Sequence, residues 1–314
     1  MSISDKRPNL SIIIPHYNSP DYLRSLLETI GFHKDVEVIV IDDHSNEKKA
    51  QYQECKEEYS RLAGFTFLQN DPDKKGAGSA RNVGLMHATG RWLIFADADD
   101  LFLQSMYEEV SRFFDSQYDI IYFPPYIDRQ NKVRDVVKNY KAMCEAYRSG
   151  IKGAETRLRY GFIVPWSKMV NADFIKNNQI MFEDVEYSND VMFSTKSGNK
   201  AKSITVCSKP IYYSTLTDGS LVKTKTEQAF FIRAKVNCEY FAYIKDCASE
   251  EEKRYLSTIA PLRTYYCIVK NGYGIQGVRK YRKLLKTYRL SIVQLRGAIE
   301  TYRLKKKIKS FESI

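Results

Sequence analysis

The sequence predicts an α/β protein with a mostly parallel, Rossmann-like sheet flanked by helices and extended by helices at its C-terminal end. Three observations predict this class. Short apolar runs alternate with segments of helical periodicity over the first 125 residues. The runs are almost continuously apolar, as strands covered on both faces are. From about residue 226 onward the pattern is helical.

The predicted strands are short and rich in β-branched residues, and they cover 10–15, 36–42, 65–69, 92–96 and 119–123. A first helix is predicted from the apolar spacing of Leu23, Leu26, Leu27 and Ile30, with Asp21 as its cap, and another from Met106 to Phe114. Residues 125–222 are less regular. In a sheet of this type ligands bind at the carboxyl ends of the strands, so we expect the chemistry there.

The chain is predicted to divide into a catalytic domain, 1–222, and a basic helical region, 223–314. The second region holds 21 basic and 8 acidic side chains, whereas the first holds 28 and 30. An apolar stripe in a basic amphipathic helix is formed by Val278, Tyr281, Leu285, Tyr288, Ile292 and Leu295. The region is expected to meet an anionic partner such as a phospholipid surface, a polyphosphate-containing substrate or nucleic acid.

The composition, with 43% hydrophobic and 28% charged residues, fits a globular protein. No apolar run approaches the roughly 18 residues that span a bilayer. The start, MSISDKRPNL, lacks the apolar stretch of an export signal. The six cysteines form no CxxC pair, which fits neither a zinc site nor a disulfide framework. We therefore expect a cytoplasmic protein.

An acidic motif, Asp97-Ala98-Asp99-Asp100, directly follows the fourth predicted strand. Two carboxylates two residues apart can share one divalent ion, and Mg²⁺ typically completes its shell with water and substrate phosphates. Alternatively, Asp99 or Asp100 caps the helix near Met106. The motif indicates either a metal site for a phosphate-bearing ligand or a helix cap.

A second acidic pair, Asp42-Asp43, follows the second strand, where a carboxylate can accept hydrogen bonds from a base or a ribose. A turn or helix cap is the alternative. The glycines between residues 76 and 84 do not have Rossmann spacing, since Arg81 stands where a glycine is needed, and this disfavours nicotinamide binding. Arg81 is predicted on the first turn of a helix, paired with phosphate or a carboxylate.

Asn189-Asp190 begins a helical stretch. By one interpretation Asn189 is an N-cap and Asp190 a first-turn acid whose charge the helix dipole favours. By the other, Asp190 is a general base, which benefits from a raised pKa. Trp166 is either a core aromatic or a platform for a sugar ring of the acceptor.

The runs SIIIPHYN, VIVIDDHS, GSARNVGL and WLIFADADD occur in this order over residues 10–104. In order and spacing they resemble family 2 of the inverting glycosyltransferases, which have the GT-A fold. The resemblance continues more weakly to about residue 216, as in bacterial enzymes that build capsule, lipopolysaccharide or exopolysaccharide.

The resemblance implies roles for particular residues. Pro15, Tyr17 and Asn18 would line the nucleotide pocket, Asp43 would hold the uracil or its equivalent, and Arg81 would lie near the nucleotide. Asp97 and Asp99 would hold Mn²⁺ or Mg²⁺, and Asp97 would also lie towards the ribose. The family's base usually lies in a Glu-Asp pair. Here Asn189 replaces the glutamate, which leaves Asp190 as the candidate, with Glu183, Asp184 and Glu186 just upstream.

The resemblance therefore implies a metal-dependent, inverting transfer of one sugar from a nucleotide-diphosphate donor, a UDP-sugar, to a saccharide or lipid-diphosphate-linked acceptor. The QxxRW motif and membrane spans of processive members are absent. The basic helices would either contact the inner face of the cytoplasmic membrane or only pack as a helical subdomain. The alternatives are a sugar-nucleotide pyrophosphorylase and a nucleic-acid-binding module. The acidic strand ends argue against nucleic acid.

Overall fold

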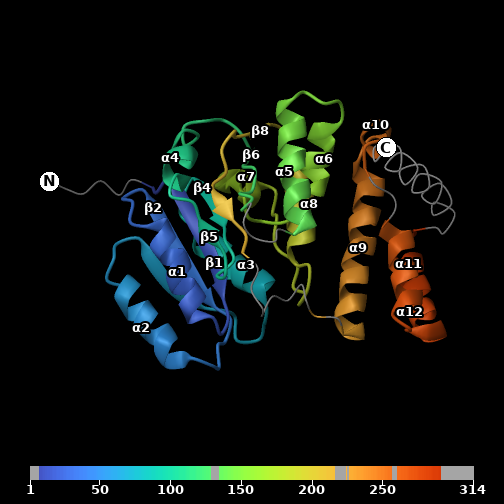
Figure 1. Ribbon diagram of the computed structural model, residues 1–314, viewed down its shortest axis with the longest axis horizontal. Helices are drawn as coiled ribbons and strands as arrows, with labels where there is room; N and C mark the ends of the chain where they lie inside the picture. Colours follow the sequence, from blue (N-terminus) through green and yellow to red (C-terminus); the bar gives the residue numbers. More distant parts are fainter. Residues whose placement is uncertain (1–6, 129–133, 216–223, 225, 257–259, 291–314) are drawn as a thin grey trace. The chain divides into compact units, whose positions relative to one another are not determined.

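The computed structural model describes residues 7–128, 134–215, 224, 226–256 and 260–290 (Figure 1). The chain forms two compact units, Met1–Ser220 and Leu221–Ile314. The assignment of catalysis to residues 1–222 and of anion contact to 223–314 stays a prediction.

The first unit contains nine strands and eight helices in its described part. The strands are β1 Leu10–His16, β2 Val36–Asp42, β3 Phe65–Gln69, β4 Trp92–Phe95, β5 Leu101–Phe102, β6 Ile120–Tyr122, β7 Lys168–Asn171, β8 Ile204–Val206 and β9 Tyr212–Tyr213. The helices are α1 Pro20–Ile30, α2 Lys49–Tyr59, α3 Ala77–His87, α4 Met106–Ser111, α5 Asp135–Arg148, α6 Ala154–Gly161, α7 Ala172–Asn177 and α8 Asp190–Lys200.

Seven strands form one sheet in the order β3-β2-β1-β4-β7-β6-β8. Only β7 runs antiparallel to its neighbours, β4 and β6. The remaining pairs in this sheet are parallel. Strands β5 and β9 form a separate antiparallel pair. The predicted fold class, a mostly parallel sheet flanked by helices, is confirmed, whereas β5, β7, β8 and β9 were not predicted.

Helices cover the sheet because its central strands are apolar on both faces. All seven residues of β1 are buried. Helices α5, α6 and α8 pack against one another beside the sheet (Figure 1). Helix α1 buries Leu23, Leu26, Leu27 and Ile30, as the spacing predicts. Its cap was wrongly predicted, because Asp21 lies inside the first turn, after Ser19 and Pro20.

The second unit consists of helices in its described part: α9 Glu227–Cys247, α10 Glu250–Lys253, α11 Ala260–Lys270 and α12 Gly274–Thr287. Tyr281 and Leu285 of the predicted stripe are buried in its core, and Val278 and Tyr288 pack against that core. Ile292 and Leu295 lie outside the described residues. The stripe therefore serves at least to hold these helices together.

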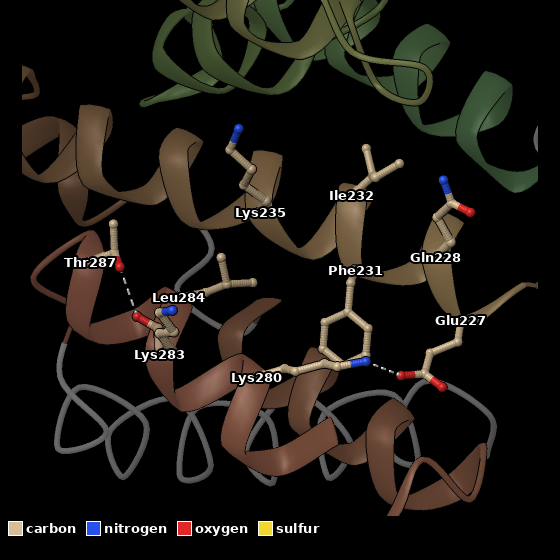
Figure 2. Close-up of a pocket in the computed structure, with 9 residues that line it drawn as sticks. All are labelled: Glu227, Gln228, Phe231, Ile232, Lys235, Lys280, Lys283, Leu284 and Thr287. Atoms are coloured by element: carbon tan, nitrogen blue, oxygen red, sulfur yellow. Dashed lines mark hydrogen bonds and ion pairs between the residues drawn. The ribbon is translucent and has the colours of Figure 1, made fainter. Parts of the chain in front are cut away.

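A shallow groove of about 620 Å³ lies between α9 and α12 (Figure 2). Apolar side chains, including Phe231 and Leu284, line it together with lysines. Lys280 pairs with Glu227 at 2.7 Å. In the part of the chain that the structure describes, no helix is long and apolar enough to cross a membrane.

Candidate active site

The acidic motif forms a loop between β4 and the short strand β5, so it does not cap a helix. The following helix, α4, begins at Met106 with Ser105 in the cap position. Asp100 is buried, accepts hydrogen bonds from the Tyr212 hydroxyl at 2.9 Å and the Thr215 amide at 2.7 Å, and thereby anchors the loop. Burial, together with the charges of Asp97 and Asp99, raises the pKa of Asp100 well above its ordinary value.

Asp97 and Asp99 present the donor set that a hard divalent cation prefers. Both residues keep partial exposure at the carboxyl edge of the sheet. Oδ1 of Asp97 pairs with Arg81, and its Oδ2 has no hydrogen-bond partner among the described residues. The described residues contain no group of three side chains able to hold a metal unaided. Two carboxylates fit a Mg²⁺ or Mn²⁺ ion that takes its remaining ligands from water and phosphate.

Arg81 connects the acidic loop to the start of helix α8. Its Nη2 lies 2.5 Å from Asp97 Oδ1, and its Nη1 donates to Asn189 Oδ1 at 2.8 Å. The guanidinium also lies over the ring of Phe182, 5.3 Å from its centre. Arg81 is on the second turn of α3, which begins at Ala77, and not on the first turn as predicted. The carboxylate partner that the sequence allowed is Asp97.

A glycine lets α3 approach the segment before α8 closely. A Cβ on Gly78 would lie 2.4 Å from the carbonyl oxygen of Glu183 and 2.8 Å from Cβ of Asn189. Real Cβ atoms do not come that near to backbone, so only glycine fits. Gly78 therefore serves packing, and the packing brings Arg81 within reach of Asn189.

Asp190 opens helix α8, but its neighbour Asn189 does not cap the helix with its side chain. That amide oxygen instead accepts from Arg81. Burial raises the pKa of Asp190 to about 6, although the positive charge of Arg81 acts in the opposite direction. The residue as a whole is partly exposed. It is thus a carboxylate at neutral pH and more basic than an ordinary aspartate, as a general base requires.

This pKa predicts a pH-dependent effect of Asp190→Asn on stability. A raised pKa means that the ionised carboxylate destabilises the fold above about pH 6. The penalty is absent below the ordinary value of 3.8, where the group is protonated in both states. We expect the variant to gain about 1–2 kcal/mol at pH 8, after discounting for partial exposure, and the gain to vanish towards pH 4.

Thermal unfolding followed by tryptophan fluorescence measures this effect, since both tryptophans, Trp92 and Trp166, lie in the first unit. An equal change in Tm at pH 8 and pH 4 would contradict the raised pKa.

Asp43 joins the loop after β2 to the loop between β3 and α3. Its Oδ2 accepts from the Gly76 amide at 2.7 Å, and its Oδ1 accepts from Asn70 at 2.6 Å. Helix α2 begins only at Lys49, so neither acid of this pair caps a helix. Each oxygen keeps a second lone pair for a ligand. The role of Asp43 towards a base stays a prediction.

The loop after β1 is positioned by Asn18, whose φ of 50° is left-handed. Its Oδ1 accepts from the amides of Asn46 and Glu47, both at 2.9 Å. Tyr17 is 43% exposed, with Lys75 Nζ 5.3 Å from its ring centre. Pro15 is buried within β1. These residues lie at the same sheet edge as Asp43, and their contact with a nucleotide stays a prediction.

Sequence analysis missed His16, because it lacks a metal-ligand spacing. Its ring is buried and stacked on Tyr52, with 4.7 Å between ring centres. The Ser19 amide donates to Nε2 at 3.2 Å, which assigns the proton to Nδ1, 2.9 Å from Asp42. Burial raises the pKa of Asp42, but hydrogen bonds from His16, Ser45 and Gln69 outweigh it and lower that pKa to about 2. The pair holds the ends of β1 and β2 in place.

Trp166 does not offer a face to a sugar, which corrects the prediction that it is an acceptor platform. It is 3% exposed and stacked on Tyr212 with the ring centres 5.5 Å apart. Tyr140 and Phe162 contact it edge to face. The ring belongs to the hydrophobic core, because surrounding aromatics cover it.

The mostly parallel sheet with an acidic loop at its carboxyl edge has the GT-A fold of glycosyltransferases. Residues 11–172, just over half of the chain, match the family model Glycosyl transferase family 2. The chain belongs to this family.

Curated relatives include the poly(ribitol-phosphate) β-N-acetylglucosaminyltransferase TarS of Staphylococcus aureus, 28% identical over 218 residues, which are 67% of this chain and 36% of TarS. The chain thus matches about a third of the length of that relative. It is also 22% identical over 290 residues to the putative glycosyltransferase EpsH of Bacillus subtilis, covering 89% of this chain and 81% of EpsH.

Two solved structures are similar in fold. The structure of TarS residues 1–349 with UDP-GlcNAc matches with a TM-score of 0.67 and 22% identity, covering 89% of this chain and 80% of that one. The structure of the mannosyltransferase PcManGT of Pyrobaculum calidifontis, in complex with GDP-Man and Mn²⁺, matches with a TM-score of 0.57 and 15% identity. The match covers 96% of this chain and 81% of that one. At these identities the likeness shows the fold alone.

Proposed function

We propose that this glycosyltransferase transfers a single sugar from a nucleotide-diphosphate donor, a UDP-sugar, to a saccharide or lipid-linked saccharide acceptor of a surface polysaccharide. The transfer depends on Mn²⁺ or Mg²⁺ and inverts the anomeric centre. Asp190 is the general base, Asp97 and Asp99 hold the metal, and Pro15, Tyr17, Asn18, Asp43, Arg81 and Asp97 form the donor site.

One observation carries this proposal: Arg81 joins the metal-binding carboxylate Asp97 to Asn189, the neighbour of Asp190. The bridge supports the proposal because it joins the acidic loop to the start of α8, and the donor's diphosphate and the acceptor's hydroxyl would have to meet there. TarS, solved with UDP-GlcNAc, supports a UDP-sugar donor, and PcManGT, solved with Mn²⁺, supports a divalent metal.

In the proposed reaction Asp190 removes the proton from the acceptor hydroxyl as its oxygen attacks the anomeric carbon. A single displacement from the face opposite to the leaving group inverts that carbon. When bound, the metal neutralises the charge that grows on the departing diphosphate. Arg81 keeps the acidic loop and the start of α8 in register, and Tyr17 and Asn18 bind the nucleotide.

A donor panel tests the proposal. The protein is incubated with nucleotide sugars and Mn²⁺ or Mg²⁺, with and without EDTA, and thermal shift and nucleotide release are followed. We expect one UDP-sugar to raise Tm and to be hydrolysed slowly, and EDTA to remove both effects. A shift with nucleoside triphosphate instead would favour the pyrophosphorylase. Salt-sensitive oligonucleotide binding without any donor response would favour a nucleic-acid-binding module.

The second unit would bring the enzyme to an anionic surface. Its described helices carry exposed basic side chains such as Lys270, Arg279 and Arg282. Basic helices gain affinity for anionic lipids at low salt. We expect sedimentation with anionic vesicles at low ionic strength and release at high salt. Absence of the protein from the vesicle pellet at low salt would leave packing as the role of these helices.

A further inference from the structure

A second cavity, of about 690 Å³, lies in the first unit and is lined by the segment after β6, by α5 and by Ser208 and Pro210 after β8. Strands β6 and β8 are parallel, and β6 has the same direction as β4, because both are antiparallel to β7. The segments after β6 and β8 therefore leave the sheet at the edge that carries Asp97 and Asp99.

Strand β9 connects this cavity to the acidic loop. The amide of Tyr126, which lines the cavity, donates to the Tyr212 carbonyl oxygen at 2.9 Å. The hydroxyl of Tyr212 accepts from the Asp97 amide at 2.9 Å and donates to Asp100. Neighbouring paired backbones lie about 5 Å apart. The cavity is thus separated from the acidic loop by one strand, a distance that an acceptor of several units can span.

Two cations and two anions line the cavity, and one of the cations, Arg148, has no partner among the described residues. Lys141 lies 3.8 Å from Glu145, and Asp128 accepts from the Tyr213 hydroxyl at 3.4 Å. Arg148, exposed at the end of α5, makes no hydrogen bond or ion pair with any residue that the structure describes. A guanidinium binds phosphate oxygens through two parallel hydrogen bonds. The guanidinium of Arg148 is therefore available to bind one phosphate group of a ligand.

The cavity also has an apolar side. Pro124 and Pro125 are buried beneath it, and Tyr126 is 39% exposed. The ring of Tyr126 is held edge to face against Tyr213, 5.5 Å between centres, so its orientation is fixed. An aromatic face with few rotatable bonds provides contact area for a carbon skeleton at small entropic cost.

We propose that this cavity is an acceptor subsite for a phosphate-linked saccharide or polyol chain. A carbon skeleton of the chain packs on Tyr126, and its phosphate binds Arg148, while the accepting hydroxyl of a neighbouring unit reaches Asp190. The proposal rests on the proposed function and names its acceptor class. Tyr126 takes the part that sequence analysis gave to Trp166, which is buried.

Titration with a short poly(ribitol phosphate) oligomer at fixed low salt, without donor, tests the subsite in the full chain. We expect Tyr126→Ala and Arg148→Gln each to weaken binding about tenfold, the effect of losing one good contact. Arg157→Gln, which removes an exposed charge of α6 outside the cavity, is the matched control and should bind as the wild type does.

Three results would overturn the subsite: no binding of the oligomer by the wild type, equal loss in the control, or unchanged affinity in both cavity variants. Inorganic phosphate as a second probe must bind more weakly than the oligomer, since equal affinity would remove the role of Tyr126. Donor binding, measured separately by thermal shift with UDP-GlcNAc and Mn²⁺, should be the same in all variants. If the wild type binds the oligomer but does not bind the donor, the result counts against the proposed function and not against the subsite.

Discussion

Asp190→Asn is expected to lower the rate of sugar transfer by about 10³-fold while donor affinity stays within about twofold of wild type. The reason is that an amide cannot accept the proton of the attacking hydroxyl, whereas it keeps nearly the same shape. The pKa of Asp190, raised by burial to about 6, suits this role at neutral pH. Transfer is measured as nucleotide release with acceptor present, and donor affinity by thermal shift.

The acids upstream of Asp190 provide the control. Glu183 pairs with Lys196 at 2.9 Å, and Asp184 and Glu186 are exposed. We expect Asp184→Asn and Glu186→Gln to transfer sugar at rates close to wild type. Near-normal transfer by Asp190→Asn, with loss in one of these two variants, would move the base to that residue.

Asp99→Asn is expected to abolish the metal-dependent part of donor binding. With Mn²⁺ present, the variant should bind the donor at least about tenfold more weakly than the wild type does. With EDTA present, the two proteins should bind the donor equally. The reason is that a neutral amide is a poorer ligand for a hard cation than a carboxylate. Titration of the donor at several Mn²⁺ concentrations measures this effect without reference to turnover.

Asp115→Asn is the matched control, because Asp115 is an exposed acid that pairs with Arg91 at 3.4 Å before the start of β4, whereas the acidic loop follows the end of that strand. It should show the wild-type dependence on Mn²⁺. If Asp99→Asn also keeps that dependence, Asp99 is not a metal ligand. Together the two variants separate donor binding from proton removal. Asp99→Asn is expected to lose metal-dependent donor binding, whereas Asp190→Asn is expected to keep donor binding and to lose sugar transfer.

The sequence determined the elements whose signal is local. Short apolar runs predicted β1 to β4 within a residue or two. The runs are nearly uninterrupted in β1, β2 and β4 because these strands are buried on both faces. The acidic motifs at Asp43 and Asp97 were recognised because they directly follow such strands. Their placement at one sheet edge then follows from the parallel arrangement, which the structure confirms.

Only the tertiary structure decided the partners of these residues. Arg81 and Asn189 are 108 positions apart, and their contact depends on Gly78 allowing α3 to approach the chain before α8. Propensity could not show whether Asn189 caps the helix with its side chain or what surrounds Asp190. The structure shows that Asn189 makes no side-chain cap and that burial raises the pKa of Asp190, and the role of Asp190 as base stays a prediction.

The same holds for the aromatic residues. Sequence analysis offered Trp166 as a possible sugar platform and did not single out Tyr126. Packing buries Trp166 and leaves Tyr126 39% exposed beside a cavity. Local sequence thus sets which segments become strands and helices and which polar groups lie at their ends. Long-range packing sets which of those groups meet, how much water reaches them and therefore what chemistry they can perform.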